Sequence, residues 1–171
     1  LAAELDFQAI VDLVGDKRRE VCATPDLSIN WYDERANLLH YLYSYEHGKR
    51  LRIAPRPPVP GGLFETMAHT RQPQVVNSFA MGNAIPGTDQ SKSMIAMPII
   101  SSDRVLGMIG IENYERENAY SESYVRLLGT IAASLGTALQ NARLFDETQR
   151  LFKAEQQRAA ELAVINSIQQ G

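Results

Sequence analysis

The sequence predicts an α+β domain in which helices pack against one antiparallel sheet. Three observations predict it: two pairs of apolar segments joined by polar turns, a helical pattern at each end, and about fifty residues after Ser121 without proline. Hairpins enclosed between helices are typical of an antiparallel sheet with helices packed on it. The chain has 171 residues, 44% of them hydrophobic, which is enough for one such core.

The first half of the chain predicts a helix followed by a hairpin. Residues 5–21 carry apolar side chains at helical spacing, and Pro25 follows them. Residues 27–33 and 38–47 are apolar and aromatic segments separated by a polar turn, which predicts two paired strands. Simple alternation along the second strand predicts that its three tyrosines share one face. These residues are Tyr41, Tyr43 and Tyr45.

The middle of the chain predicts short elements and long loops. A proline-rich loop over residues 49–60 precedes a short helix over 63–70 and a possible strand over 74–77. Residues 79–91 form a long irregular segment, and loops of about a dozen residues are often functional. The proline-rich loop also holds a basic cluster, which is either solvated or able to attract an anion. The cluster consists of Lys49, Arg50, Arg52 and Arg56.

The last third predicts a second hairpin and a very long helix. The hairpin spans residues 92–114 with a turn at 101–104, and Ser121 is a candidate N-cap for the helix. An apolar seam then follows at alternating steps of three and four. Its members are Val125, Leu128, Ala132, Leu135, Leu139 and Ala142. Nearly fifty helical residues would extend roughly 70 Å, which one small domain cannot cover. A thinner stripe suits a partner helix, and it consists of Leu144, Leu151, Leu162 and Ile165.

Four motifs in this last third resemble the GAF domain family of small-molecule sensors. They are SMIAMPII at residues 93–100, GMIGI at 107–111, YSESYVRL at 120–127 and ALQNARLF at 138–145. The resemblance implies a central antiparallel sheet of five or six strands. It places the N- and C-terminal helices on one face, as the dimer side, and a helix-loop ligand cover on the other. The segments implied in that cover are residues 63–70 and 79–91.

The resemblance also implies a domain organisation and a function. Residues 1–143 would be the GAF domain, and residues 144–171 a signalling helix leading to a further domain. The tail INSIQQG resembles the entry to another GAF domain in tandem arrays of bacterial signalling proteins. We therefore expect a homodimeric regulatory domain that binds a small molecule and signals to a kinase, cyclase or phosphodiesterase in the same protein. The alternatives are a ligand-free dimerisation module and, third, an enzyme.

The expected ligand-binding residues combine aromatic side chains and methionines, which suit a plastic apolar cavity. They are Tyr43, Phe64, Phe79, Met81 and Met97. Some members of the family bind cyclic nucleotides through a motif that Asn113 and Tyr120 could match. This sequence departs from that motif at three positions, which argues against that ligand. These positions are Tyr114, Tyr124 and Val125.

Catalytic and metal chemistry find little support in the residue types. Cys22 is the only cysteine, so it forms no internal disulfide, which suits the cytoplasm, and it has no histidine nearby in sequence. His40 and His47 lie an odd number of positions apart on one predicted strand, and His69 has no partner one turn away. We expect no enzyme activity, no metal and no cofactor. The net charge of -3 and the absence of a run of about 20 apolar residues argue against nucleic-acid and membrane partners.

Overall fold

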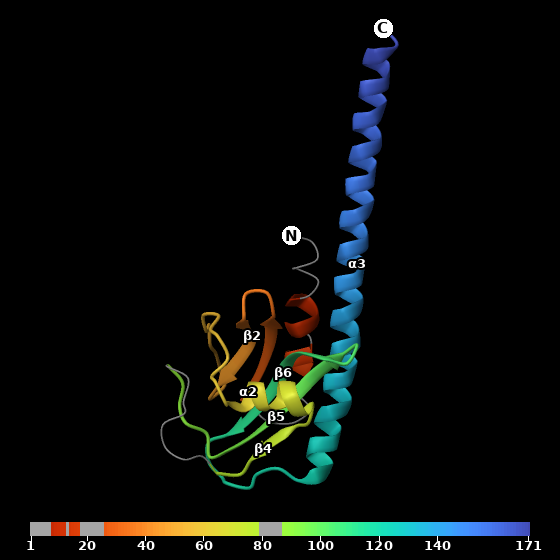
Figure 1. Cartoon of the computed structure of the whole chain (residues 1–171). Coiled ribbons are helices and arrows are strands. Elements are labelled where there is room, and N and C mark those ends of the chain that lie inside the picture. Colours follow the sequence, from red (N-terminus) through yellow and green to blue (C-terminus); the bar gives the residue numbers. More distant parts are fainter. Residues whose placement is uncertain (1–7, 13, 18–25, 79–86) are drawn as a thin grey trace.

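The structure is a computed structural model that describes residues 8–12, 14–17, 26–78 and 87–171 (Figure 1). A short N-terminal helix, of which residues 8–12 and 14–17 are described, precedes the labelled elements. These are β1 (Leu27–Asp33), β2 (Leu38–Glu46), β3 (Lys49–Arg50), α2 (Leu63–Thr70), β4 (Gln74–Val76), β5 (Ser93–Ser101), β6 (Arg104–Asn113) and α3 (Glu122–Gln169). The six strands form one antiparallel sheet in the order β3-β2-β1-β6-β5-β4. The predicted α+β class and sheet are confirmed.

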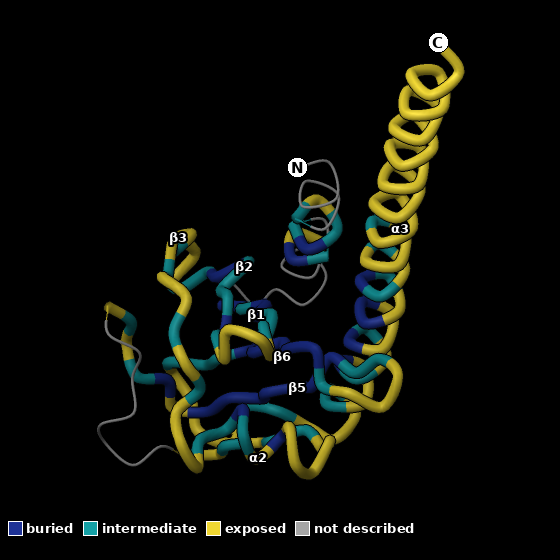
Figure 2. Tube along the Cα trace, turned by 45° about the horizontal axis from the view of Figure 1, so that its top comes forward, coloured by how far each residue is buried: buried dark blue, intermediate teal, exposed yellow. Residues whose placement is uncertain are grey.

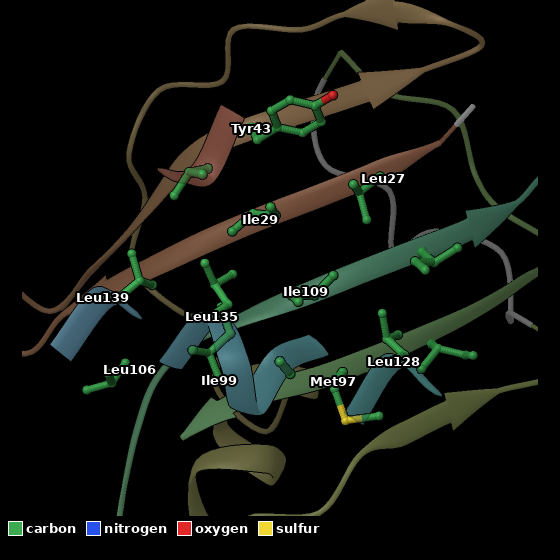
Figure 3. Packing of buried hydrophobic residues seen from close by; sticks show 14 residues of the cluster. Leu27, Ile29, Tyr43, Met97, Ile99, Leu106, Ile109, Leu128, Leu135 and Leu139 are labelled. Carbon is green, nitrogen blue, oxygen red and sulfur yellow. The ribbon is translucent and has the colours of Figure 1, made fainter. Parts of the chain in front are cut away.

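The sheet has a hydrophobic layer on each face. On one face, isoleucines of β1, β5 and β6 pack under the N-terminal helix and α3, as Ile29, Ile99 and Ile109 do in Figure 3. On the other face, Phe64 of α2 packs with Met108 of β6 in a smaller cluster. The two terminal helices therefore share one face, and α2 covers the other, as the resemblance to the GAF family implied.

A β-bulge in β2 divides the tyrosines between these two faces. Ile29 of β1 pairs with Tyr43, whereas the next residue, Asn30, pairs with Tyr41, so Leu42 is an extra residue in β2. An extra residue reverses the side-chain alternation beyond it. Tyr43 thus lies in the helix-side cluster and Tyr41 packs against the cluster on the opposite face. The prediction of one tyrosine face is wrong because it assumed unbroken alternation.

Helix α3 begins at the predicted cap, where the Ser121 hydroxyl accepts a hydrogen bond from the Tyr124 N–H at 3.3 Å. Its apolar seam is buried against the sheet of its own chain, with Leu139 fully buried. The seam was expected on the dimer side, but the sheet already covers Leu128, Leu135 and Leu139 (Figure 3). No helix within the described residues is both long and apolar enough to cross a bilayer.

Beyond the sheet, α3 continues as a single exposed rod (Figure 2). From residue 143 onward every residue is exposed except Asp146, although the helix has no break until Gln169. At about 1.5 Å per residue its 48 residues extend roughly 70 Å. The proposed domain boundary after residue 143 coincides with this change from covered to exposed helix, and the boundary itself stays a prediction.

Candidate ligand-binding cavity

A cavity of about 580 Å³ lies on the face of the sheet opposite α3. Its floor includes Asn30, Tyr41 and Met108 from three adjacent strands, and Phe64 of α2 lines it from the covering side. The proline-rich loop adds further apolar walls, including Leu51. Cavities of this size are typical of sites for small molecules.

The structure brings one of the five expected ligand-binding residues to this cavity. Phe64 lies on its wall, and its role in binding stays a prediction. Tyr43 lies on the opposite face, where its hydroxyl donates a hydrogen bond to Asp16 Oδ1 at 2.8 Å. Met97 also belongs to the helix-side core, while Met94 of the same strand lines the cavity.

The misplacement of these two residues has a simple physical origin. The bulge at Leu42 turns Tyr43 to the other face of the sheet. Met97 alternates in step with Ile95 and Ile99 along β5, so all three side chains face α3. The other two expected residues, Phe79 and Met81, lie outside the described residues.

Three carboxylate residues that the sequence analysis did not predict for the site lie together at one end of the cavity. Leu27 pairs with Tyr45 on one side and with Ile111 on the other, so the adjoining residues of three strands come together. These adjoining residues are Asp26, Glu46 and Glu112, and all three line the cavity. The signal that could have found them is a polar residue at the end of a strand, but only the strand register shows that the three converge.

Several polar atoms of the cavity wall lack a hydrogen-bond partner within the described part of the chain. They are Asp26 Oδ1, Asn30 Oδ1 and Ser44 Oγ, each buried. A buried polar atom without a partner costs about 1–3 kcal/mol, so native proteins keep few of them. Their common position on the cavity wall indicates a surface that remains unsatisfied without a ligand or ordered water.

Burial raises the pKa of the Glu112 carboxyl, and the nearby Glu46 and Asp26 carboxylates raise it further. The Tyr114 hydroxyl donates a hydrogen bond to Glu112 Oε2, which opposes that rise. The same burial, together with the Glu112 charge, raises the pKa of Tyr114 well above its ordinary value. Tyr114 therefore stays protonated at neutral pH and acts as a donor to the carboxylate.

The raised pKa of Glu112 predicts a pH-dependent cost to stability. Because the folded pKa exceeds the unfolded value near 4.5, the folded protein holds more protons, and stability falls as pH rises from about 4.5 through the folded pKa. Glu112→Gln imitates the protonated carboxyl, so we expect its melting temperature to match wild type near pH 4, below the unfolded pKa, and to exceed it by a few degrees near pH 8. Thermal denaturation of both proteins across this range measures the difference. Equal curves at every pH would contradict it.

A second polar cluster lies at the rim of the cavity. His47 Nε2 lies 2.9 Å from Asp89 Oδ2 and 3.8 Å from Glu46 Oε1, and ligand atoms of all three residues lie within 4.8 Å of one another. The hydrogen bond to Asp89 raises the pKa of His47, which also packs against the Tyr114 ring at a centroid distance of 4.6 Å. Mutual pairing of the imidazole and the carboxylates accounts for this exposed cluster without a metal ion.

The fold and its cavity define a small α+β domain with a covered, ligand-sized pocket on one side of the sheet. The sequence profile of the GAF domain matches residues 4–140, and the chain belongs to this family. No curated protein sequence matches the chain significantly.

Solved structures share the fold at low sequence identity. The blue-light absorbing form of the PixJ GAF domain from Thermosynechococcus elongatus has a TM-score of 0.69 and 14% identity, over 90% of this chain and 96% of that one. The second GAF domain of DevS from Mycobacterium smegmatis has a TM-score of 0.64 and 13% identity, over 85% of this chain and 99% of that one. Residues 122 to 287 of a methyl-accepting chemotaxis protein have a TM-score of 0.69 and 16% identity, over 82% of this chain and 92% of that one.

Proposed function

We propose that this GAF domain is a regulatory sensor, which binds a small molecule in the cavity and changes the packing of α3. The observation that carries the proposal is that the cavity and α3 lie against opposite faces of the same strands. The structural relatives include domains of a photoreceptor and of a chemotaxis protein, which supports a sensory role. We place this regulatory role, rather than a catalytic one, in the cytoplasm, which the lone cysteine suits.

The relay follows from neighbouring residues on single strands. Met108 lines the cavity while Ile109, the next residue of β6, packs in the core beneath the helices. Met94 and Ile95 stand in the same relation on β5. A ligand that shifts the cavity floor therefore acts directly on the surface that holds α3. Ligand binding would change the populations of two α3 arrangements in proportion to its preference for one of them.

The exposed part of α3 would carry this change to a partner helix and to an output domain in the same protein. Its apolar side chains beyond the sheet would otherwise remain in water. They include Leu144, Leu151, Leu162 and Ile165, all at least half exposed. Their spacing suits a parallel helix pair in a homodimer. This exposed surface equally supports the second candidate function, a dimerisation module without a ligand.

Leu151→Glu is expected to weaken the homodimer by introducing a charge into the helix pair. Leu151 is 66% exposed within the chain, so the domain itself should fold normally. Gln149→Glu is the matched control, because two residues of an α-helix turn by about 200° and carry the same charge to nearly the opposite side. Sedimentation equilibrium should show a dimer for wild type and the control and a monomer for Leu151→Glu. A dimer in all three would contradict the assignment of this stripe.

Ligand binding is tested by a thermal-shift screen of small metabolites that covers cationic, anionic and neutral compounds. The proposal expects a compound that raises the melting temperature of wild type. Met108→Trp, which adds bulk to the cavity floor, should abolish the shift, while circular dichroism checks that the variant remains folded. If no compound of any charge class binds, the ligand-free dimerisation module becomes the better account.

A further inference from the structure

We propose that the cavity binds an organic cation whose protonated amine or amidine group lies among Asp26, Glu46 and Glu112. This inference rests on the proposed ligand-binding function and names the chemical class of the ligand. It follows from the charges of the cavity wall, the unpartnered acceptors on it, and the volume of the cavity.

The charges of the wall are unbalanced. Among the described lining residues, four carry carboxylates and only Arg56 carries a positive charge. The carboxylates belong to Asp26, Glu46, Asp89 and Glu112. The main chain of Arg56 pairs with Leu39, which lies seven residues along β2 from Glu46. The Arg56 backbone therefore lies at the opposite end of the cavity from Glu46. His47 lies against two of these carboxylates, those of Glu46 and Asp89. Within the described residues, neither Asp26 nor Glu112 has a cation at ion-pair distance.

Three buried side-chain oxygen atoms of the cavity wall can accept hydrogen bonds, and within the described residues they have no donor. Asp26 is only 7% exposed, and its Oδ1 has no partner among the described residues. Ser44 Oγ, two residues along β2 from Glu46, is likewise buried and unpartnered there. Asn30 Oδ1 is also unpartnered, but it lies four residues along the strand from Asp26, roughly 13 Å away and too far for the same ammonium. A carboxylate oxygen only accepts hydrogen bonds, whereas an ammonium offers three donors and no acceptor. An ammonium would thus supply both the charge and the donors, while a phosphate or carboxylate would meet like charges.

The volume argues for an organic cation rather than a metal ion. About 580 Å³ corresponds to many water molecules at about 30 Å³ each, far more than one ion requires. Phe64, Leu63 and Leu51 add apolar walls, which suit the carbon skeleton of an amine. The metal-like cluster at Glu46, His47 and Asp89 lies at the rim and is largely exposed, so it does not account for the buried acceptors.

The test compares compounds that share a skeleton and differ in charge. One set is tyramine, 4-hydroxyphenylacetate and tyrosol, and the other is putrescine, succinate and 1,4-butanediol, with cyclic AMP and Zn²⁺ as further arms. Thermal shift identifies binders, and isothermal titration calorimetry measures their affinity. We expect an amine to raise the melting temperature while the carboxylate and the alcohol of the same skeleton do not.

Charge-removing variants then locate the binding site. Asp26→Asn and Glu112→Gln should each weaken amine binding by about 10- to 100-fold, the loss typical of one charge-assisted hydrogen bond. Glu147→Gln, an exposed position on α3 away from the cavity, should leave the affinity unchanged. Because Asp26→Asn could disturb folding, Glu112→Gln, which retains an acceptor for Tyr114, provides the second measurement.

The outcomes separate this inference from the function on which it rests. Binding of anions, neutral compounds or Zn²⁺ without any amine would overturn the cationic ligand and leave a ligand-binding domain. Amine binding that Asp26→Asn and Glu112→Gln do not weaken would equally overturn the assigned site. If no compound of any charge class binds, both the inference and the ligand-binding function fail.

Discussion

Replacing Leu139 by alanine is expected to lower the free energy of unfolding by about 2–5 kcal/mol, the range measured for buried leucines. Leu139 is fully buried on α3 and packs in the same core as Ile29 and Ile109 beneath the helix (Figure 3). The strands below it form a hydrogen-bonded sheet, so they cannot move together to fill the space. The cost should therefore include both the lost burial and the remaining cavity.

Leu151→Ala is the matched control, because it deletes the same atoms from the same helix at a position that is 66% exposed. Urea denaturation of both variants should give a loss near zero for Leu151→Ala once the protein is dilute enough to be monomeric. The measurement is repeated at several protein concentrations, since dimerisation stabilises the folded state by mass action. Similar losses for the two variants would show that α3 is not anchored on the sheet at Leu139.

Substituting arginine for a buried leucine of the α3 seam should disrupt the folding of the domain itself, and not only its association with a second copy. The apolar periodicity of α3 shows that one side of the helix is covered, but it does not identify what covers it. The sequence suggested a partner subunit for Leu135 and Leu139, whereas the sheet of the same chain buries both. Leu135→Arg would then leave an unpaired charge inside the core, and the whole domain should lose its fold. The exposed stripe that includes Leu151 remains available to a partner helix.

The elements that the sequence predicted well are those defined by local signals. The short helix over residues 63–70 is found at Leu63–Thr70, and α3 begins directly after the expected Ser121 cap. The strand over 27–33 is also found as predicted. Turn residues, apolar periodicity and capping act within a few positions of the chain. They are therefore readable without knowledge of the tertiary structure.

The candidate site depends on relations between strands, which the sequence alone does not contain. The bulge at Leu42 appears only when β2 pairs with β1, and it moves Tyr43 away from the cavity. The acidic end requires the register of three strands, because Asp26, Glu46 and Glu112 are far apart in the chain. Alternation along β6 puts Met108 and Ile109 on opposite faces of the sheet, but alternation alone does not show which face is hollow. Register and bulges are thus the missing information.

Gly136→Ala is expected to destabilise the domain by about 1–3 kcal/mol although alanine is the better helix former. A Cβ at this position would lie 2.6 Å from the carbonyl oxygen of Ile100 and 3.4 Å from Ile99 Cγ2. The first of these atoms is backbone at the end of β5, so relief requires α3 to move away from the sheet. Overpacking of this kind costs about 1–3 kcal/mol and outweighs the roughly 1 kcal/mol gained in helix propensity.

Gly129→Ala provides the matched control in the same helix, two turns earlier. Its added Cβ would lie 3.8 Å from Met97 Sδ and Cε, an ordinary van der Waals contact. We therefore expect Gly129→Ala to raise the free energy of unfolding by up to about 1 kcal/mol, through helix propensity alone. Stabilisation by both substitutions would show that α3 does not approach β5 as closely as Gly136 indicates. The proposed relay reaches α3 partly through β5, and Gly136→Ala would move the helix away from that strand. Gly136→Ala should therefore also reduce any ligand-dependent change in α3, whereas Gly129→Ala should preserve it.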